Sequence, residues 1–225
     1  MKKKYDIVIF DLDGTLLDTI DDLGTAVNHA LSQGGWPLHS MQEYRKMVGH
    51  GVRNLVTLAL PERLQGDEAL IDSTLAAFKA YYTGHIDVHT HPYEGIVELI
   101  HDLCAAGTMV AVASNKFQSG TETLVAGFFP GVDFLAVLGN AEGAPLKPDA
   151  AIVRSIIDRS GLDAPAAVMV GDSGTDMRTA ANGRIPSVGV TWGFRPEEDI
   201  RAAGASVIAR SVDELRSALL FPEGE

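Results

Sequence analysis

The sequence predicts an α/β fold in which a parallel sheet carries helices on both faces and one all-helical insertion interrupts the chain. Three observations lead to this prediction. Ile7–Phe10 is a short apolar run of the kind found in buried parallel strands. The stretch from Ile20 to about His89 shows only helical patterns, and strands and helices alternate after His91.

The predicted insertion contains several helices separated by glycine and proline. Ser40 and Glu43 have the spacing of a capping box at the start of one of them. Because no strand-like alternation interrupts the helical patterns, we expect residues 18–89 to form a separate helical domain. Residues 1–17 and 90–225 would then form the α/β core.

The second part of the chain alternates in type at regular intervals. Helical patterns cover residues 95–107, 118–128, 149–161, 175–182, 197–204 and 212–220, and strand patterns cover residues 109–114, 134–139, 166–172, 187–192 and 205–209. Strands and helices of this length in alternation indicate a parallel sheet, to which the first strand also belongs.

Length, charge and cysteine content limit the possible functions. A chain of 225 residues with 46% hydrophobic residues can bury a proper core. Its formal net charge of −12 argues against non-specific binding to nucleic acid or to an anionic membrane. Cys104 has no second cysteine to pair with, which favours a reducing, cytoplasmic location. The basic start, Met1–Lys4, precedes too few apolar residues for a signal peptide or a membrane helix.

Two carboxylates follow the first strand. Asp11 and Asp13 lie two residues apart at the strand end, so they project to the same side, and Gly14 turns the chain after them. Like charges this close repel, and a hard divalent cation with oxygen ligands would offset that repulsion. A polar turn without further function is the alternative for this stretch alone.

Polar residues also follow the later strands. Ser114 and Asn115 end one strand, Asp172 ends another within Gly-Asp-Ser-Gly-Thr-Asp, and Lys147 precedes a helix. Ligands of parallel α/β sheets bind at the carboxyl ends of the strands, so these side chains are expected at one edge. Taken singly, Ser114 or Asp172 could cap a helix and Lys147 could be a solvated loop charge.

This ordered set resembles the four motifs of the haloacid dehalogenase-like superfamily, beginning with Asp-x-Asp-Gly-Thr in Asp11–Thr15. The resemblance implies a Rossmann-like three-layer core and makes the helical insertion a C1 cap. Most members of that superfamily are Mg²⁺-dependent phosphotransferases. The Ser-Asn-Lys sequence at Ser114 is similar to the Thr-Asn-Lys of phosphoglycolate phosphatase-like members.

The resemblance also implies a role for each residue. Asp11 would be the nucleophile that forms an aspartyl-phosphate, and Asp13 the general acid/base. Mg²⁺ would be bound by Asp11, Asp172 and the backbone carbonyl of Asp13, with Asp176 as a water-mediated ligand. The phosphoryl oxygens would be held by Ser114 and Lys147, with Asn115 as a further candidate, and Lys116 would either join the site or face solvent.

Substrate specificity is expected in the cap. Gly49, His50 and Arg53 belong to a segment that resembles the part of the cap facing the active site in these relatives. Two glycines, Gly49 and Gly51, allow the backbone to approach a ligand closely. Arg53 would pair with a substrate carboxylate or a second phosphate, or it is a surface arginine.

We therefore predict a Mg²⁺-dependent phosphatase that hydrolyses a small, soluble phosphomonoester similar to phosphoglycolate. A sugar-phosphate mutase, an inorganic pyrophosphatase and a catalytically silent metabolite-binding module are the alternatives. The expected partner is a small phosphorylated metabolite, with no nucleic acid or membrane partner, and the chain is expected to be a monomer or a homodimer.

Overall fold

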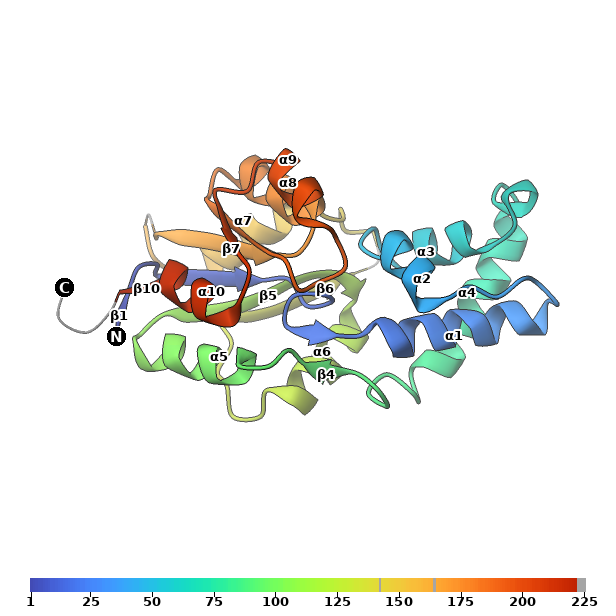
Figure 1. Cartoon of the computed structure of the whole chain (residues 1–225), viewed down its shortest axis with the longest axis horizontal. Helices are drawn as coiled ribbons and strands as arrows, with labels where there is room; N and C mark the ends of the chain where they lie inside the picture. The colour runs from blue at the N-terminus through green and yellow to red at the C-terminus, as the bar shows by residue number, and fades with distance from the viewer. Residues whose placement is uncertain (142, 164, 222–225) are drawn as a thin grey trace.

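The computed structural model describes residues 1–141, 143–163 and 165–221 and contains the predicted central sheet (Figure 1). Its six strands are all parallel, in the order β6-β5-β2-β7-β8-β9. The strands are β2 (Ile7–Phe10), β5 (Met109–Phe117), β6 (Ala136–Asn140), β7 (Ala167–Gly171), β8 (Ser187–Val190) and β9 (Val207–Ala209). The predicted α/β fold class is thus confirmed, and β2 lies at the centre of the sheet.

Helices cover both faces of this sheet because its strands are apolar on both faces. Val8 and Phe10 face α5 (Ile96–Ala105), α6 (Gln118–Phe128) and α10 (Val212–Leu219). Ile7 and Ile9 point the opposite way, into a second core with α7 (Ala151–Arg159) and α8 (Gly174–Gly183). The short helix α9 (Glu197–Ala202) packs on that same face beside α8 (Figure 1). Buried on both faces, β2 carries no polar residue until Asp11.

The predicted helical segment is present between β3 (Leu17–Asp18) and β4 (His91–Pro92). It contains α1 (Ile20–Gln33), α2 (Met41–Met47), α3 (Val52–Ala59), η1 (Glu62–Leu64) and α4 (Glu68–Tyr82), which lie together beyond one end of the sheet (Figure 1). The capping box at Ser40 is present, since the Ser40 N–H donates to Glu43 and the Glu43 N–H donates to Ser40 Oγ. The proposed domain boundaries, 17/18 and 89/90, stay a prediction.

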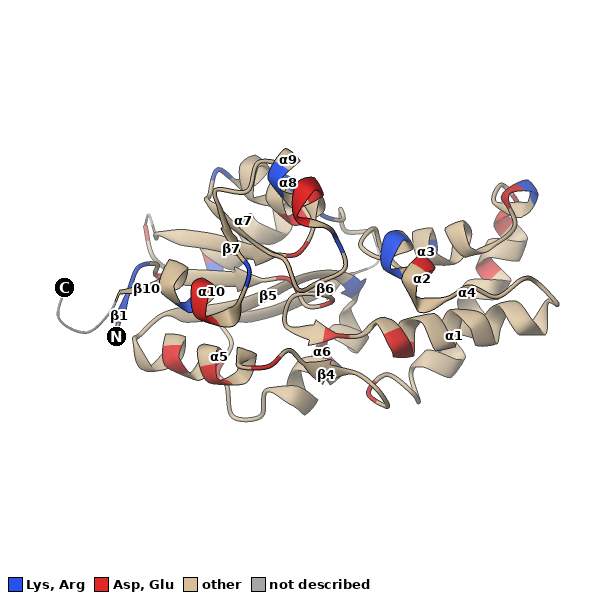
Figure 2. Ribbon diagram, in the orientation of Figure 1, with Lys and Arg blue, Asp and Glu red and all other residues tan. Residues whose placement is uncertain are grey.

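Short pairings that the sequence did not indicate join distant parts of the chain. The strand β3 (Leu17–Asp18) pairs antiparallel with β4 (His91–Pro92), so the two connections to the helical segment lie side by side. Near the termini, β1 (Lys2–Lys3) pairs with β10 (Leu220–Phe221). Among the described residues, no helix is both long enough and apolar enough to span a bilayer. In Figure 2 acidic positions are spread over both parts of the molecule, and a basic stretch marks α2.

A buried carboxylate connects the start of α1 to the chain that returns to the core. Asp22 is 3% exposed and accepts hydrogen bonds from the backbone N–H of His89 (2.9 Å) and from the N–H and Oγ1 of Thr90 (both 2.8 Å). These three donors satisfy a carboxylate that would otherwise be costly to bury. Asp22 therefore holds the chain that returns to the core, at His89 and Thr90, against the chain that enters the helical segment.

We predict that Asp22→Ala lowers the free energy of unfolding by about 3 kcal/mol, because it removes charge-assisted hydrogen bonds and leaves buried donors unpaired. Urea unfolding measures the change. The matched control is Asp21→Ala, since Asp21 is exposed in the same helical turn, and its cost should stay below about 1 kcal/mol. Equal losses for the two variants would contradict the assigned role of Asp22.

Candidate active site

The turn after β2 carries the first two carboxylates into the site. Asp11 continues the pairing with β7 through its N–H, which donates to the Val170 carbonyl at 2.9 Å. Gly14 then adopts a positive φ of 84°, and a Cβ there would lie 2.5 Å from Asp172 Oδ2. Only glycine meets both requirements, so the turn can press directly against Asp172.

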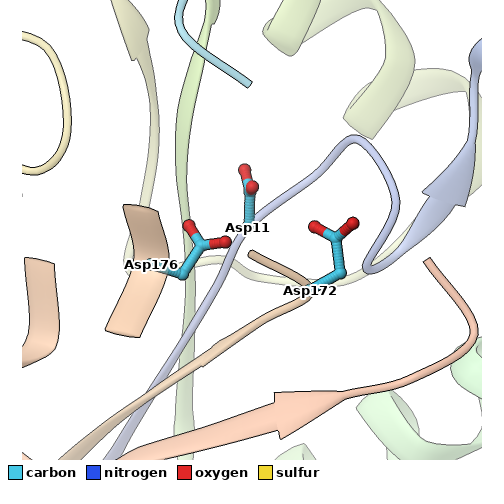
Figure 3. Close-up of side chains that lie close together, drawn as sticks. All are labelled: Asp11, Asp172 and Asp176. Carbon is cyan, nitrogen blue, oxygen red and sulfur yellow. The ribbon is translucent and has the colours of Figure 1, made fainter. Parts of the chain in front are cut away.

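Three carboxylates meet at this edge of the sheet. Asp11, Asp172 and Asp176 each offer an oxygen within 4.8 Å of the others, from the ends of β2 and β7 and the first turn of α8 (Figure 3). Lys147 lies among them, with Nζ 2.9 Å from Asp11 Oδ1 and 2.7 Å from Asp176 Oδ1. One lysine thus faces three carboxylates.

The electrostatics of the site follow from this imbalance. Burial, together with the charge of Asp176, raises the pKa of Asp172 to about 7. Burial and the charge of Asp176 also raise the pKa of Asp11 well above its ordinary value. Although burial alone would lower it, the pKa of Lys147 is raised by Asp11 and Asp176. Carboxylates gathered in this way can hold a metal ion, whose charge would favour their ionised form.

Asp13 lies in a second cluster beside the first. Its Oδ1 accepts hydrogen bonds from Thr19 Oγ1 at 2.8 Å and from Lys116 Nζ at 3.0 Å. The Asp13 side chain is therefore held apart from the three grouped carboxylates. The sequence left Lys116 undecided between the site and solvent, and the structure buries it.

The structure excludes the simpler alternatives for three predicted site residues. Ser173, and not Asp172, is the N-cap of α8, and its Oγ accepts from the Asp176 N–H. Ser114 caps no helix, because β5 continues past it to Phe117 through an irregular register. Lys147 is buried and paired, and does not face solvent.

Asn115 has a structural use that the sequence did not reveal. Its Nδ2 donates to the carbonyls of Gly49 (3.0 Å) and Lys147 (3.1 Å), and its Oδ1 accepts from the Lys147 N–H (2.8 Å). Both ends of the amide are thus used within the protein, which argues for support of Lys147 more than for phosphate binding. The same contact ties the helical segment to the core.

A pocket lies between the helical segment and this edge of the sheet. The core contributes mostly polar residues to its lining, and the helical segment contributes mostly apolar ones. The lining residues are Asp11, Asp13, Ser114, Asn115, Lys116, Phe117, Asp172, Ser173, Phe194 and Arg195 from the core, and Leu23, Val48, Gly49, Gly51, Val52, Leu55 and Phe78 from the helical segment. Most of the predicted site residues therefore meet in one place.

The loop after β8 was missed by the sequence analysis. Its Phe194 N–H donates to Asp172 Oδ2 at 2.7 Å, and Arg195 donates to backbone carbonyls at the end of α2, including that of Val48. A Cβ on Gly193 would lie 2.3 Å from the Gly14 carbonyl, so this loop packs closely against the first turn. No residue type in this loop indicates such a role before folding.

Two of the cap residues predicted to bind substrate lie outside the pocket lining. His50 is exposed and lines a neighbouring hollow with Arg178 and Arg195. Arg53 is exposed, and its guanidinium pairs with Glu68 and Asp72. The structure thus favours the surface-arginine alternative for Arg53, because both ends of its guanidinium bind carboxylates of α4.

The fold and the carboxylate cluster together define a class of hydrolases. Residues 8–190 match the family described as haloacid dehalogenase-like hydrolase, and the chain belongs to that family. It is 34% identical over 210 residues to a phosphoglycolate phosphatase of Mesorhizobium japonicum, covering 93% of this chain and 92% of that protein. A phosphoglycolate phosphatase of Agrobacterium fabrum is also 34% identical, over 84% of this chain and 81% of its own length.

Solved structures agree with this assignment. A Lactobacillus delbrueckii subsp. bulgaricus structure, whose own assignment as a phosphoglycolate phosphatase is provisional, has a TM-score of 0.90 and 32% identity, covering 99% of this chain and all of that one (100%). A predicted phosphatase from Clostridium acetobutylicum has a TM-score of 0.84 and 27% identity, covering 95% of this chain and 97% of its own. The family and the predicted enzyme class, a phosphoric monoester hydrolase, are confirmed.

We predict that Arg53→Ala leaves kcat/KM within about twofold of the wild type, because Arg53 pairs with the exposed carboxylates of Glu68 and Asp72. The measurement compares p-nitrophenyl phosphate with an anionic phosphomonoester such as phosphoglycolate. A loss of about tenfold or more on the anionic ester alone would restore Arg53 as a substrate ligand.

Proposed function

We propose that this chain is a Mg²⁺-dependent phosphatase that hydrolyses a small anionic phosphomonoester, such as phosphoglycolate, through an aspartyl-phosphate on Asp11. The single observation that carries the proposal is Lys147, 2.9 Å from Asp11 and 2.7 Å from Asp176, beside a third buried carboxylate. A buried, singly charged lysine among three carboxylates fits a site completed by a divalent cation and an anionic phosphoryl group.

The roles of the residues follow from where they lie. When bound, Mg²⁺ would be held by Asp11 and Asp172, with Asp176 nearby, and would offset the charge of the phosphoryl group. Asp11 attacks phosphorus while Asp13 gives a proton to the leaving oxygen. Water then attacks the aspartyl-phosphate, Asp13 takes the proton, and Asp11 is regenerated. Ser114 and Lys147 hold the phosphoryl oxygens during both steps.

The non-reacting part of the substrate would meet the helical segment, residues 18–89, which we propose as a cap. Gly51 is the N-cap of α3 and has no capping side chain, and Gly51 and Val52 line the pocket. Free backbone N–H groups at a helix start favour an anion such as a carboxylate. The rest of the cap wall is apolar, which suits a small substrate that the closed pocket excludes from water.

The Mesorhizobium and Agrobacterium relatives are phosphoglycolate phosphatases, so we do not propose a mutase or a pyrophosphatase. A product assay tests this choice. With Mg²⁺ the protein should release phosphate from phosphoglycolate and p-nitrophenyl phosphate, and chelation should stop both reactions.

Asp11→Asn should fold and bind Mg²⁺ but lose turnover, because an amide cannot accept the phosphoryl group. Phosphate release under chelation, or normal turnover by Asp11→Asn with deamidation excluded by mass spectrometry, would contradict the proposal. Faster phosphate release from pyrophosphate than from any monoester would favour the pyrophosphatase.

We predict that Mg²⁺ binding tightens as the pH rises from about 6 to about 8. The pKa of Asp172 is raised to about 7, so below that pH protons compete with the metal, and above it the carboxylate is free to bind. The expected gain approaches tenfold per pH unit on the acid side, as for release of about one proton. Calorimetric titration in two buffers of different ionisation enthalpy measures the affinity and the protons released. Binding without pH dependence and without proton release would contradict the assignment of Asp172.

A further inference from the structure

The site contains a second buried lysine to which the proposed mechanism gives no task. Lys116 follows Ser114 and Asn115 on β5, where the register with β6 becomes irregular. Its side chain is 3% exposed, close to the 2% of Lys147. Burying a lysine is costly unless its charge is paired, so the neighbours of Lys116 must explain this placement.

The partner of Lys116 is the proposed general acid/base. Nζ lies 3.0 Å from Asp13 Oδ1 and 3.3 Å from Oδ2. Thr19 Oγ1 donates to the same Oδ1 at 2.8 Å. The carboxylate is 14% exposed and is held from two directions, one on β5 and the other just before α1. With Oδ1 bound twice, Oδ2 is the oxygen left freer to exchange a proton.

The helical segment also contacts Lys116, through Tyr82. Tyr82, at the end of α4, is fully buried, and the Lys116 ammonium lies 4.9 Å from the centre of its ring. An aromatic face stabilises a desolvated cation. Although burial alone would lower it, the pKa of Lys116 is raised by Asp13, so the lysine stays charged across the working range of pH.

We infer that Lys116 is a positioning residue that holds the Asp13 carboxylate, with Oδ2 directed to the leaving oxygen and later to the attacking water. The inference rests on the proposed function. In the first step the bond from Asp11 to phosphorus forms, the bond to the leaving oxygen breaks, and the Asp13 proton moves to that oxygen. In the second step water bonds to phosphorus, its proton moves to Asp13, and the bond to Asp11 breaks.

Comparing two leaving groups separates a role in proton transfer from a merely structural role. A merely structural role would change the rates for both leaving groups alike. An alkoxide needs a proton as it departs, whereas p-nitrophenolate leaves readily without one. Since kcat/KM reports only the steps up to release of the alcohol, it separates the first proton transfer from the second. Lys116→Met should therefore lower kcat/KM for phosphoglycolate by about 10- to 100-fold, part of the usual general acid/base contribution, and for p-nitrophenyl phosphate by less than about threefold.

The second step gives an independent signature. With Asp13 poorly held, hydrolysis of the aspartyl-phosphate slows, so Lys116→Met should release a rapid burst of p-nitrophenol equal to the enzyme concentration before steady turnover. Lys116→Arg keeps the charge and should recover part of the activity on phosphoglycolate. Lys79→Met removes an exposed lysine of α4 and should leave both substrates unaffected.

Equal losses on the two substrates, or a rise in KM on both, would overturn the inference and make Lys116 a phosphoryl ligand or a folding residue. If Lys116→Met does not fold, Thr19→Val removes the other donor to Oδ1 and undergoes the same comparison. The proposed function is tested separately, because the wild type with Mg²⁺ either hydrolyses both esters or does not, whatever the variant does.

Discussion

The excess of buried negative charge at the carboxyl edge of the sheet is the constraint on which the site depends. Lys147 pairs with Asp11 and Asp176, Asp172 lies beside them, and Asp172 and Asp176 each accept a further hydrogen bond. The Phe194 N–H binds Asp172, and Ser173 binds Asp176. The folded chain therefore holds these carboxylates together despite their mutual repulsion. A bound cation, followed by a phosphoryl group, would then find the site already arranged.

The same edge joins the two parts of the chain. Asn115 binds Lys147 on one side and the Gly49 carbonyl on the other, and Arg195 binds carbonyls at the end of α2. These contacts run from the helical segment to the groups that hold Asp11 and Asp172. The residues that shape the pocket and the residues that carry its chemistry thus share one hydrogen-bonded frame.

Much of the fold and the core of the site could be predicted from the sequence. The apolar β2 and the alternation after His91 predict the sheet, and parallel topology places Asp11, Lys147 and Asp172 together. The rest depends on tertiary contact. Nothing local to Lys116 distinguishes burial beside Asp13 from exposure, and the pairing of Arg53 with Glu68 and Asp72 appears only once α3 and α4 pack together. The loop at Phe194 acts through a backbone N–H, which no residue type signals.

Covalent phosphorylation of Asp11 is the step on which the proposed function depends, and trapping that species tests it most directly. The Asp13→Asn variant, in which the proposed second step should be slowed, is mixed with Mg²⁺ and p-nitrophenyl phosphate and quenched in acid within milliseconds. Mass spectrometry of the whole chain and of its peptides should find one phosphoryl group per molecule, on the peptide that contains Asp11. Unmodified protein at a time when p-nitrophenol has already been released would show direct attack by water and contradict the account.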